Sequence, residues 1–503
     1  MEVLLSAIMG QLQPLVLLTL VCCVVIGMII GAIPGLTVSI AVALAVPIAI
    51  FMPTNIALAM LVSLYGAGVY GGSVSAILLS APGTPASAAT IFDGHPMAKQ
   101  GLATKALRIS LFASTFGSVF SIVLLVTVAP VLANFALKFG PVEMASILLF
   151  TFTIIGTISG NSMVNGLFSA AVGMLLATVG SDPMMGTPRF TFGLTELSDG
   201  LTYIPLLVGL FALAEVIKEA ANGFVQDTVC VQVKDENKAR NKISFGDLKM
   251  IFMPMVRGAS IGSFIGLLPG IGSTIAAFLA YADAKRAAGK AGKFGKGDIR
   301  GIASPESANN AVGGATFIPT LALGIPGDAV TAILLGAMVM MGVTPGPLMF
   351  ITNPEVVYGI YVVLCFSTLL MVVIGFVATR PLSMVLQLPK IYLLPLVSLT
   401  CVAGSFVVRN NFIDILVMLA AGILGFIFSK VRIPVTPLLI SFIITPPFEE
   451  SVRQALTLSE GSLAIFLKNP VAVGCISAAL VIVFLVTRAR KLATMSTSEN
   501  VGE

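Results

Sequence analysis

Long apolar runs are the feature that most restricts how this 503-residue chain can fold. Hydrophobic residues make up 57% of the chain and charged residues only 10%, whereas soluble domains carry about 25% charged residues. A water-soluble fold could not bury so much apolar side chain, so the solvent around the protein must be lipid. The chain is therefore predicted to be an all-α, polytopic membrane protein.

Sixteen apolar runs are long enough to cross a bilayer or to come close to doing so. They lie at 14–32, 36–52, 57–80, 106–133, 143–160, 163–180, 200–222, 251–268, 271–282, 303–324, 327–350, 355–379, 391–408, 412–429, 433–447 and 470–487. Several are shorter than the roughly 20 residues that a spanning helix requires, and the short ones cluster around Pro-Gly pairs. We therefore expect about 11–14 membrane segments, some of them broken or re-entrant at Pro-Gly motifs.

Basic residues gather in a few of the predicted connections, and they indicate how the chain is oriented. Lys and Arg concentrate at 99–108, 234–249, 285–300 and 488–491, whereas acidic or mixed stretches lie at 182–199 and 449–460. Cytoplasmic loops of membrane proteins carry the excess of Lys and Arg. The N-terminus is therefore expected outside and the C-terminus in the cytoplasm, provided that the chain turns back at the Pro-Gly segments near residues 34 and 269.

Residues that usually carry metal or catalytic chemistry are scarce. The six cysteines form no C-x-x-C pair and the only histidine is His95, so neither a zinc site nor a disulfide framework is expected. The net charge of +5 comes from lysines and arginines gathered in loops, which gives no reason to expect nucleic-acid binding. No cofactor is predicted. No enzyme activity is predicted either, because the sequence offers scattered acids but no paired acid and base at membrane depth.

An internal repeat is the most informative pattern in the chain. Residues 26–41 read IGMIIGAIPGLTVSIA and residues 261–276 read IGSFIGLLPGIGSTIA, so eight of sixteen aligned positions are identical. Apolar sequence produces chance matches, but a whole G-x-x-x-G-x-x-P-G frame is not expected by chance. The match indicates that the two halves of the chain arose by duplication.

Each half continues with a second matching motif. The sequence GG at 71–72 leads to PGT at 82–84, and GG at 313–314 leads to PGD at 326–328. With the orientation above, the two halves have inverted topology, which is typical of secondary transporters. The expected domains are a first transmembrane repeat at 1–225, a cytoplasmic linker at 226–250, a second transmembrane repeat at 251–487 and a cytoplasmic tail at 488–503.

The Pro-Gly pairs are predicted to break helices, because proline lacks a backbone donor and glycine tolerates positive φ. In lipid the freed backbone groups would cost several kcal/mol each, so such breaks survive only inside protein or along a wet cavity. A helix that restarts there points its free amides toward the midplane. Four such helix starts would hold a carboxylate without a buried Lys or Arg. The alternative is that the pairs are only kinks or tight packing points.

Candidate site residues follow from this argument. The candidate substrate-binding residues are the Pro-Gly pairs and the small polar residues after them: Pro34, Gly35, Thr37, Ser39, Pro82, Gly83, Thr84, Ser87, Pro269, Gly270, Ser273, Thr274, Pro326 and Gly327. The carbonyls exposed at the opposing helix ends could coordinate Na⁺. No transition-metal site is expected.

Two carboxylates in apolar sequence are the candidates for ion coupling. Glu306 lies in SPESANN at 304–310, and a carboxylate at membrane depth is costly and usually functional. Alternatively, Ser304-Pro305 could cap a helix and leave Glu306 as an interfacial charge in its first turn. Asp328 could either cap the helix that restarts after its Pro-Gly pair or bind a cation or proton. Together with Asn309 and Asn310, the two acids form the predicted ion-coupling set, for Na⁺ or H⁺.

Two long strings in the repeat resemble a known family. The run YGGSVSAILLSAPGTPASAATIFDGHPMAKQG at 70–101 is similar to a signature of the large membrane subunit of tripartite tricarboxylate transporters. The run SPESANNAVGGATFIPTLALGIPGDAVTAILLGAMVMMGVTPGPLMF at 304–350 is similar to its counterpart in the second half. The resemblance extends from about residue 14 to residue 487. It implies that Asp328 stands where the family often has a small hydroxyl residue.

The resemblance implies a permease of the bacterial inner membrane that works with a small membrane subunit and a periplasmic solute-binding protein. Its substrates would be di- or tricarboxylates, taken up by symport with an ion and without ATP, which agrees with the absence of a G-x-x-x-x-G-K-[ST] loop. Three alternatives stay open at this point: a stand-alone carrier without a binding protein, a passive anion channel, and an intramembrane enzyme.

Overall fold

The computed structural model describes residues 2–158, 162–182, 184–223, 241–377, 381–382, 384 and 390–499. Within these residues the secondary structure is helical except for one antiparallel pair of two-residue strands, β1 (Gly180–Ser181) and β2 (Pro188–Arg189). The prediction of an all-α fold is confirmed. The predicted linker lies mostly outside the described residues, because only 241–250 of it are described.

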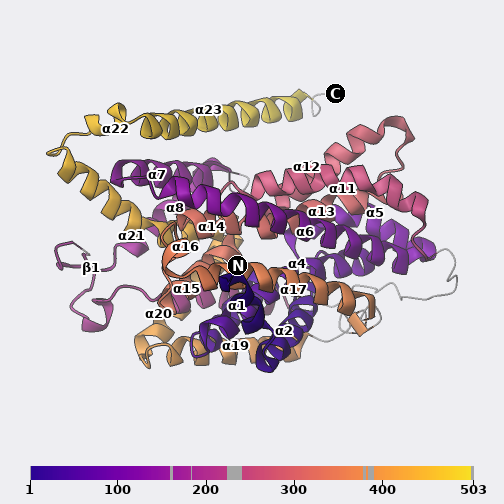
Figure 1. Cartoon of the computed structure of the whole chain (residues 1–503), viewed down its shortest axis with the longest axis horizontal. Helices are drawn as coiled ribbons and strands as arrows, with labels where there is room; N and C mark the ends of the chain where they lie inside the picture. Colours follow the sequence, from indigo (N-terminus) through magenta and orange to yellow (C-terminus); the bar gives the residue numbers. More distant parts are fainter. Residues whose placement is uncertain are drawn as a thin grey trace. The chain divides into compact units, whose positions relative to one another are not determined.

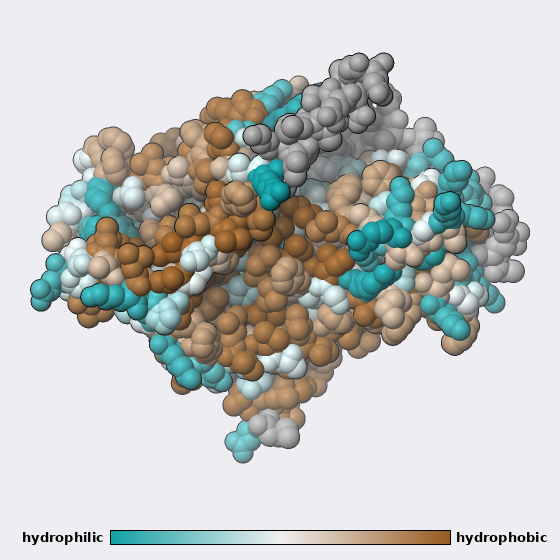
Figure 2. Space-filling view, turned by 90° about the horizontal axis from the view of Figure 1, so that it is seen from above, coloured by the Kyte–Doolittle hydropathy of each residue, from teal (hydrophilic) through white to brown (hydrophobic). Residues whose placement is uncertain are grey.

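Seven of the described helical segments are long and apolar enough to cross a membrane, which confirms a polytopic membrane protein. They are Pro14–Ala32, Thr54–Leu79, Pro85–Ala136, Phe245–Gly266, Pro354–Val377, Phe412–Lys430 and Pro470–Arg488. Five shorter apolar helices of 10–17 residues accompany them. Brown, apolar side chains make up much of the face drawn in Figure 2, as expected of helices whose outer surfaces meet lipid.

The chain divides into two compact units that differ from the two sequence halves. The first unit comprises Met1–Asn134, Tyr203–Leu268 and Gly272–Phe426, and the second comprises Phe135–Thr202, Pro269–Ile271 and Ile427–Glu503. Each unit therefore takes segments from both halves of the sequence.

The first unit contains most of the helices. They are α1 (Glu2–Gln11), α2 (Pro14–Ala32), α3 (Val38–Ala49), α4 (Thr54–Leu79), α5 (Ala88–Met97), α6 (Ala103–Ala136), α9 (Tyr203–Leu207), α10 (Ala214–Asn222), α11 (Phe245–Gly266), α12 (Gly272–Ala288), α13 (Arg300–Ala315), α14 (Phe317–Leu323), α15 (Ala329–Met340), α16 (Met349–Thr352), α17 (Pro354–Val377), α19 (Lys390–Val407) and α20 (Phe412–Lys430). Short 3₁₀ or π segments join some of them: η1 (Pro85–Ser87), η2 (Ala98–Leu102), η4 (Val208–Leu213) and η5 (Gly289–Ala291).

Helix α4 forms the centre of the first unit (Figure 1). Its most apolar window is 89% buried, whereas those of the other six candidate spans are at most half buried. Helices α2, α3, α5, α13 and α17 pack around it. A Cβ built on Gly31 of α2 would overlap the carbonyl oxygen of Gly68 of α4, so the two helices touch through their backbones. Helices α11 and α13 make the same kind of contact, at Gly262 and Ala308.

The helices that follow the Pro-Gly pairs pack reciprocally between the two sequence halves. Within the first unit, η1 and α5 of the first half lie against α12 and α13 of the second half. Helix α15 of the second half lies against α3 and α4 of the first half. Each half therefore covers a restarted helix of the other, and most of the polar residues at the breaks are partly buried.

The second unit is smaller and is built around α21 (Val435–Leu458). Its other elements are α7 (Pro141–Ile158), α8 (Met163–Ala177), η3 (Thr195–Leu197), α22 (Ala464–Lys468), α23 (Pro470–Glu499) and the strand pair. Helix α21 packs on α7 and α8, and α23 packs on α7. Arg453 pairs with Glu449 at 2.5 Å and with Asp182 at 2.9 Å, while Arg189 reaches Glu449 at 2.7 Å. These ion pairs fasten the acidic loop after α8 to α21.

Candidate functional site

The first Pro-Gly pair of each half lies in a gap between two helices. Pro34-Gly35 separates α2 from α3, and Pro269-Gly270 separates α11 from α12. Gly35 has φ 94° and Gly270 has φ 80°, which is the left-handed region that glycine adopts without strain. The prediction that these pairs end helices is confirmed at both positions.

The second Pro-Gly pairs share a longer local structure. The residue that follows α4, Ser80, has φ 57°, and the residue that follows α14, Gly324, has φ 69°. Four residues further on, Thr84 forms a capping box with Ser87. At the equivalent place Asp328 forms a capping box with Thr331, and so caps α15. The two breaks therefore agree in backbone conformation and in capping. The expectation that Asp328 caps the helix that restarts after its Pro-Gly pair is confirmed.

The two second breaks are packed closely against neighbouring residues. The amide of Gly83 donates to the carbonyl of Gly72 at 3.3 Å, and a Cβ on Gly83 would overlap the carbonyl oxygen of Gly31. A Cβ on Gly327 would lie 2.7 Å from Cβ of Thr316. Only glycine fits at such close approaches, so the breaks also serve as tight packing points, as the alternative interpretation held.

Three of the four breaks belong to the first unit, and the fourth does not. Pro269–Ile271 belongs to the second unit, where a Cβ on Gly270 would lie 2.6 Å from Cγ1 of Ile155. The meeting of all four breaks around one ligand therefore stays a prediction. Ser273 and Thr274 begin α12, and both are half-buried.

A polar contact that joins the two sequence halves lies near the middle of α4. The hydroxyl of Tyr65 donates to Oδ2 of Asp328 at 2.6 Å and lies 3.5 Å from Oγ1 of Thr316. Tyr65 is 11 residues beyond Thr54, the first residue of α4, or roughly 16 Å along the helix axis at 1.5 Å per residue. Asp328 is therefore both the cap of α15 and the acceptor of a hydroxyl from the other half.

Glu306 forms the second contact of this kind, and its side chain is fully buried. Ser73 of α4 donates to its Oε2 at 2.5 Å, and Ser114 of α6 lies 3.4 Å from the same oxygen. Thr90 of α5 donates to Oε1. All three hydroxyls come from the first sequence half and the carboxylate from the second. Unpaired, a buried carboxylate would be very costly, so this cluster of donors is what makes its position tolerable.

The interpretation of Glu306 as an interfacial first-turn charge is wrong. Helix α13 begins at Arg300, so Ser304 and Pro305 lie inside it, and the Ser304 hydroxyl donates to the carbonyl of Ala280 at 2.9 Å. The N-cap residue is Ile299, and the carboxylate of Asp298 just before it accepts the amide of Arg300 at 3.0 Å. Glu306 is consequently well within the helix and faces the hydroxyl cluster.

The two asparagines beside Glu306 differ in their environment. Nδ2 of Asn310 donates to the carbonyl oxygen of Glu306 at 3.0 Å. Nδ2 of Asn309 is buried and has no hydrogen-bond partner among the described residues. In the first half, Thr37 caps α3 without a side-chain hydrogen bond, and Ser39 lies in the first turn of that helix. Nothing in the sequence indicated that Tyr65 would bond to Asp328, or that Ser73 and Ser114 would bond to Glu306.

Asp93 holds the basic loop that precedes α13. Its Oδ1 accepts the amides of Gly295, Gly297 and Asp298 at 2.8–2.9 Å, and its Oδ2 accepts the hydroxyl of Tyr281 at 2.9 Å. Successive amides converging on one oxygen form a backbone nest for an anion. Here a carboxylate of the chain itself occupies the nest, so the loop of the second half is fastened to α5 of the first.

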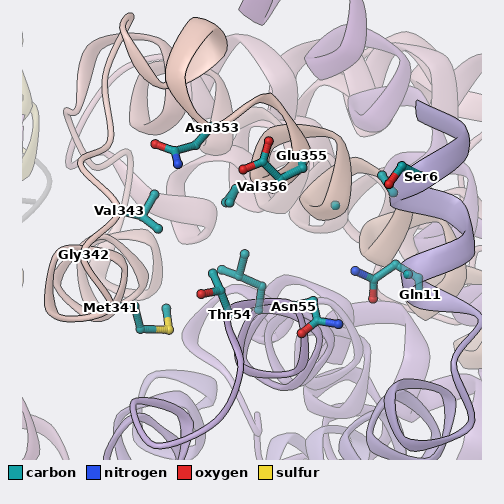
Figure 3. A pocket seen from close by; sticks show the side chains of 14 residues that line it. Ser6, Gln11, Thr54, Asn55, Met341, Gly342, Val343, Asn353, Glu355 and Val356 are labelled. Atoms are coloured by element: carbon teal, nitrogen blue, oxygen red, sulfur yellow. The ribbon is translucent and has the colours of Figure 1, made fainter. Parts of the chain in front are cut away.

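A cavity of about 380 Å³ lies at the N-terminal end of α4. Figure 3 shows its lining, to which α1 contributes Gln11, α4 contributes Asn55 and α17 contributes Glu355. Oε1 of Gln11 is buried and has no hydrogen-bond partner among the described residues. Glu355 supplies the charge of this pocket, which therefore suits a multiply charged carboxylate poorly. Scattered neutral polar residues gave no sequence signal for it.

Comparison with known proteins decides the family. A family model described as the tripartite tricarboxylate transporter TctA family matches residues 17–440. The chain belongs to the tripartite tricarboxylate transporter TctA family. The resemblance of its repeated motifs to that family is thereby confirmed, and the protein is a membrane component of a transporter.

Two relatives of this family member come from Agrobacterium vitis. An uncharacterised 52.8 kDa protein of the TAR-I ttuC′ 3′ region is 34% identical over 429 residues, which are 85% of this chain and 84% of the relative. An uncharacterised protein of the TAR-II ttuC′ 3′ region is 35% identical over 224 residues, which are 44% of this chain and 93% of the relative. No solved structure matches the chain.

Proposed function

We propose that the chain is the permease subunit of a secondary active transporter that imports small di- and tricarboxylates by alternating access. The reciprocal packing of the broken helices carries this proposal: α5 lies against α12, and α15 lies against α3. Two duplicated halves that exchange restarted helices in this way fit a mechanism in which one half moves against the other around a central site.

The substrate carboxylates would bind at helix starts. Thr37 makes no side-chain hydrogen bond to the first turn of α3. The amide of Ile40 donates to the carbonyl of Thr37, so the amides of Val38 and Ser39 remain for a ligand, next to the hydroxyls of Thr37 and Ser39. In contrast, α15 is already capped by the carboxylate of Asp328, which would repel a bound anion. We therefore assign α3, together with the equivalent start of α12 at Ser273 and Thr274, to the substrate and Asp328 to ion coupling.

The hydrogen bonds of Glu306 and Asp328 would change with the conformational state of the bundle. Glu306 and Asp328 both belong to the second half. Their hydrogen-bond donors from the first half are all hydroxyl groups. Movement of one half against the other has to lengthen these hydrogen bonds. A carboxylate that loses its donors gains a proton or a cation more readily, which is how an ion gradient would drive the movement.

The partners follow from the family and from the distribution of charge. A small membrane subunit and a periplasmic solute-binding protein would complete the transporter, as the tripartite family name implies. The basic loops before α13 and after α5 would face the cytoplasm of the bacterial inner membrane, with the N-terminus outside and the C-terminus inside. Pro-Gly breaks near residues 34 and 269 would supply the two turns that this orientation needs.

Uptake by proteoliposomes tests the proposal. The permease and its small membrane subunit are reconstituted, and uptake of radiolabelled citrate and succinate is measured with and without the binding protein, under imposed Na⁺ or proton gradients. The expected result is saturable uptake that needs the binding protein and one gradient, and that falls strongly in Pro82→Ala and Pro326→Ala. Equal uptake without the binding protein would identify a stand-alone carrier. Uptake that neither saturates nor follows a gradient would identify a channel.

A further inference from the structure

The cavity at the N-terminal end of α4 has no part in the proposed transport mechanism. Its volume of about 380 Å³ lies within the range of about 300–1,000 Å³ that small-molecule sites occupy. Its polar side chains are Ser6, Gln11, Thr54, Asn55, Asn353 and Glu355 (Figure 3). None of its 14 described lining residues is a lysine, an arginine or an aromatic residue. The cavity therefore offers a ligand one negative charge and several neutral polar groups.

Glu355 provides a place for a positive group of the ligand. It lies in the first turn of α17, which begins at Pro354, and no basic side chain lines the cavity beside it. Quaternary ammonium groups are typically bound by aromatic rings, which the described lining lacks. A primary ammonium instead donates hydrogen bonds to oxygen acceptors, and a carboxylate is the strongest of these. The lining thus selects a primary ammonium group.

Gln11 has an unsatisfied hydrogen-bonding group at the same cavity. Its side chain is 3% exposed, and its Oε1 has no hydrogen-bond partner among the described residues. A buried acceptor without a donor is costly, and rotation of the amide can turn either its oxygen or its NH₂ group toward the cavity. A ligand that carries an ammonium group supplies the donor that this amide lacks.

The start of α4 provides a place for an anionic group. Its N-cap residue, Pro53, makes no side-chain hydrogen bond. The amide of Ile56 donates to the carbonyl of Pro53 at 2.9 Å, so the amides of Thr54 and Asn55 remain for a ligand. Free amides at the positive end of a helix dipole bind phosphate groups. Since the starts of α4 and α17 both line the cavity, the ligand that fits it is a zwitterion with a phosphate and an ammonium group.

Helix α1 indicates where such a zwitterion comes from. Leu5 is 57% exposed and Met9 is 65% exposed, and they lie four residues apart on the same face of α1. Gly10 and Gln11 of this helix line the cavity instead. A helix with an exposed apolar face beside a polar one is typical of the membrane interface. A lipid lying on Leu5 and Met9 has its headgroup next to the cavity.

We propose that the cavity binds the headgroup of one zwitterionic phospholipid with a primary ammonium group, phosphatidylethanolamine. The phosphate accepts hydrogen bonds from the amides of Thr54 and Asn55, and the ammonium group donates to Glu355 and Gln11. The bound lipid thereby joins α1 to α4 and α17. The site involves neither the transported substrate nor the coupling ion, so it can fail separately from the proposed function.

Lipid retention tests the proposal without transport. The full chain is stripped of lipid in a neutral detergent and mixed with equal amounts of phosphatidylethanolamine, phosphatidylcholine and phosphatidylglycerol that carry the same acyl chains, and native mass spectrometry counts the bound lipids. We expect one phosphatidylethanolamine, retained at least about fivefold over the other two. Equal or stronger retention of either other lipid would overturn the assignment. Displacement by free phosphoethanolamine at the same concentration would place the ligand in solution and overturn it as well.

A charge-removing variant links the lipid to Glu355. Glu355→Gln keeps the size of the side chain but removes its charge, and it should lower phosphatidylethanolamine retention about tenfold. Glu2→Gln is the matched control, because Glu2 also lies in the first turn of a helix but does not line the cavity. Equal retention by these two variants would overturn the role of Glu355.

A cavity-filling variant links the lipid to the cavity itself. Nothing lies within 4 Å of a Cβ built on Gly10, so Gly10→Leu should fold with an unchanged melting temperature and lose phosphatidylethanolamine. Gly474→Leu on α23 is the matched control, because its Cβ position is equally open and lies away from the cavity. Equal lipid retention by the two folded leucine variants would place the lipid elsewhere and overturn the proposal.

Discussion

Tyr65 donates its phenolic proton to Asp328, 263 residues further along the chain, across 2.6 Å. The bond joins the middle of α4 to the first turn of α15, and so joins the first sequence half to the second. Asp328 also caps α15 through Thr331, at 2.8 Å. One carboxylate therefore holds a helix start and the contact between the halves.

Removing the Tyr65 hydroxyl should weaken this contact. Tyr65→Phe is expected to lower the free energy of unfolding by about 1 kcal/mol and to reduce carboxylate uptake about tenfold, because α15 loses its hold on α4. Thermal unfolding and proteoliposome uptake measure the two effects. Tyr358→Phe on the exposed side of α17 is the control and should change neither. A double variant with Asp328→Asn should be non-additive, and simple additivity would argue against a direct coupling.

Glu306 should be required for uptake but replaceable for folding. Glu306→Gln keeps the side chain's volume and an acceptor oxygen for the surrounding hydroxyls, so the melting temperature should stay within a few degrees, while uptake falls at least about tenfold. Glu306→Ala leaves Ser73, Thr90 and Ser114 without their acceptor and should cost about 1–3 kcal/mol for each donor left unpaired. Glu450→Gln on exposed α21 surface serves as control. Normal uptake by Glu306→Gln would remove this residue from the coupling mechanism.

The contact of α2 with α4 should not tolerate a methyl group at Gly31. In Gly31→Ala the new Cβ meets the carbonyl oxygen of Gly68, so the helices have to separate and the variant should lose about 1–3 kcal/mol of stability. Gly474→Ala on α23 is a matched control, because nothing lies within 4 Å of its Cβ position. Urea or thermal unfolding of both variants in detergent tests the difference. Two equally stable variants would mean that α2 and α4 do not touch here.

The basic loop at residues 289–299, which contains Asp298, should lose protection from amide hydrogen exchange in acid. Burial alone would raise the pKa of Asp298, but the Arg300 guanidinium and the amides of Lys293 and Arg300 lower it below its ordinary value. The stability that this carboxylate contributes is therefore fully present above the unfolded pKa, about 3.9, and is lost as the pH falls through the lower folded value. Amide hydrogen exchange at residues 289–299, corrected for intrinsic rates, should show constant protection from pH 7 to 5 and lower protection near pH 3. Asp298→Asn should show low protection at every pH from 7 to 3. Unchanged protection of the parent protein at pH 3 would contradict this account.

Local sequence rules were sufficient to predict the helix breaks, but not to predict which distant residues bond to the polar groups near them. Pro-Gly ends a helix wherever it occurs, and Asp328 with Thr331 has the spacing of a capping box, so both features could be predicted from adjacent residues. The donors to Glu306 are 192 to 233 residues away in the chain, and nothing local distinguishes Ser73 from other serines in apolar runs. The start of α13 could not be predicted locally, because Ser304 followed by Pro305 resembles a helix start, whereas the observed N-cap residue, Ile299, makes no side-chain hydrogen bond.

The reciprocal packing of restarted helices also constrains how the protein is made. Helix α3 is complete at residue 49, but the helix that covers it, α15, begins 280 residues later at Ala329. At about 5–20 residues per second of synthesis, this interval is roughly 15–60 s. Throughout it the face of α3 that α15 covers in the finished protein lacks that partner, so the first half has to enter the membrane before its final packing exists.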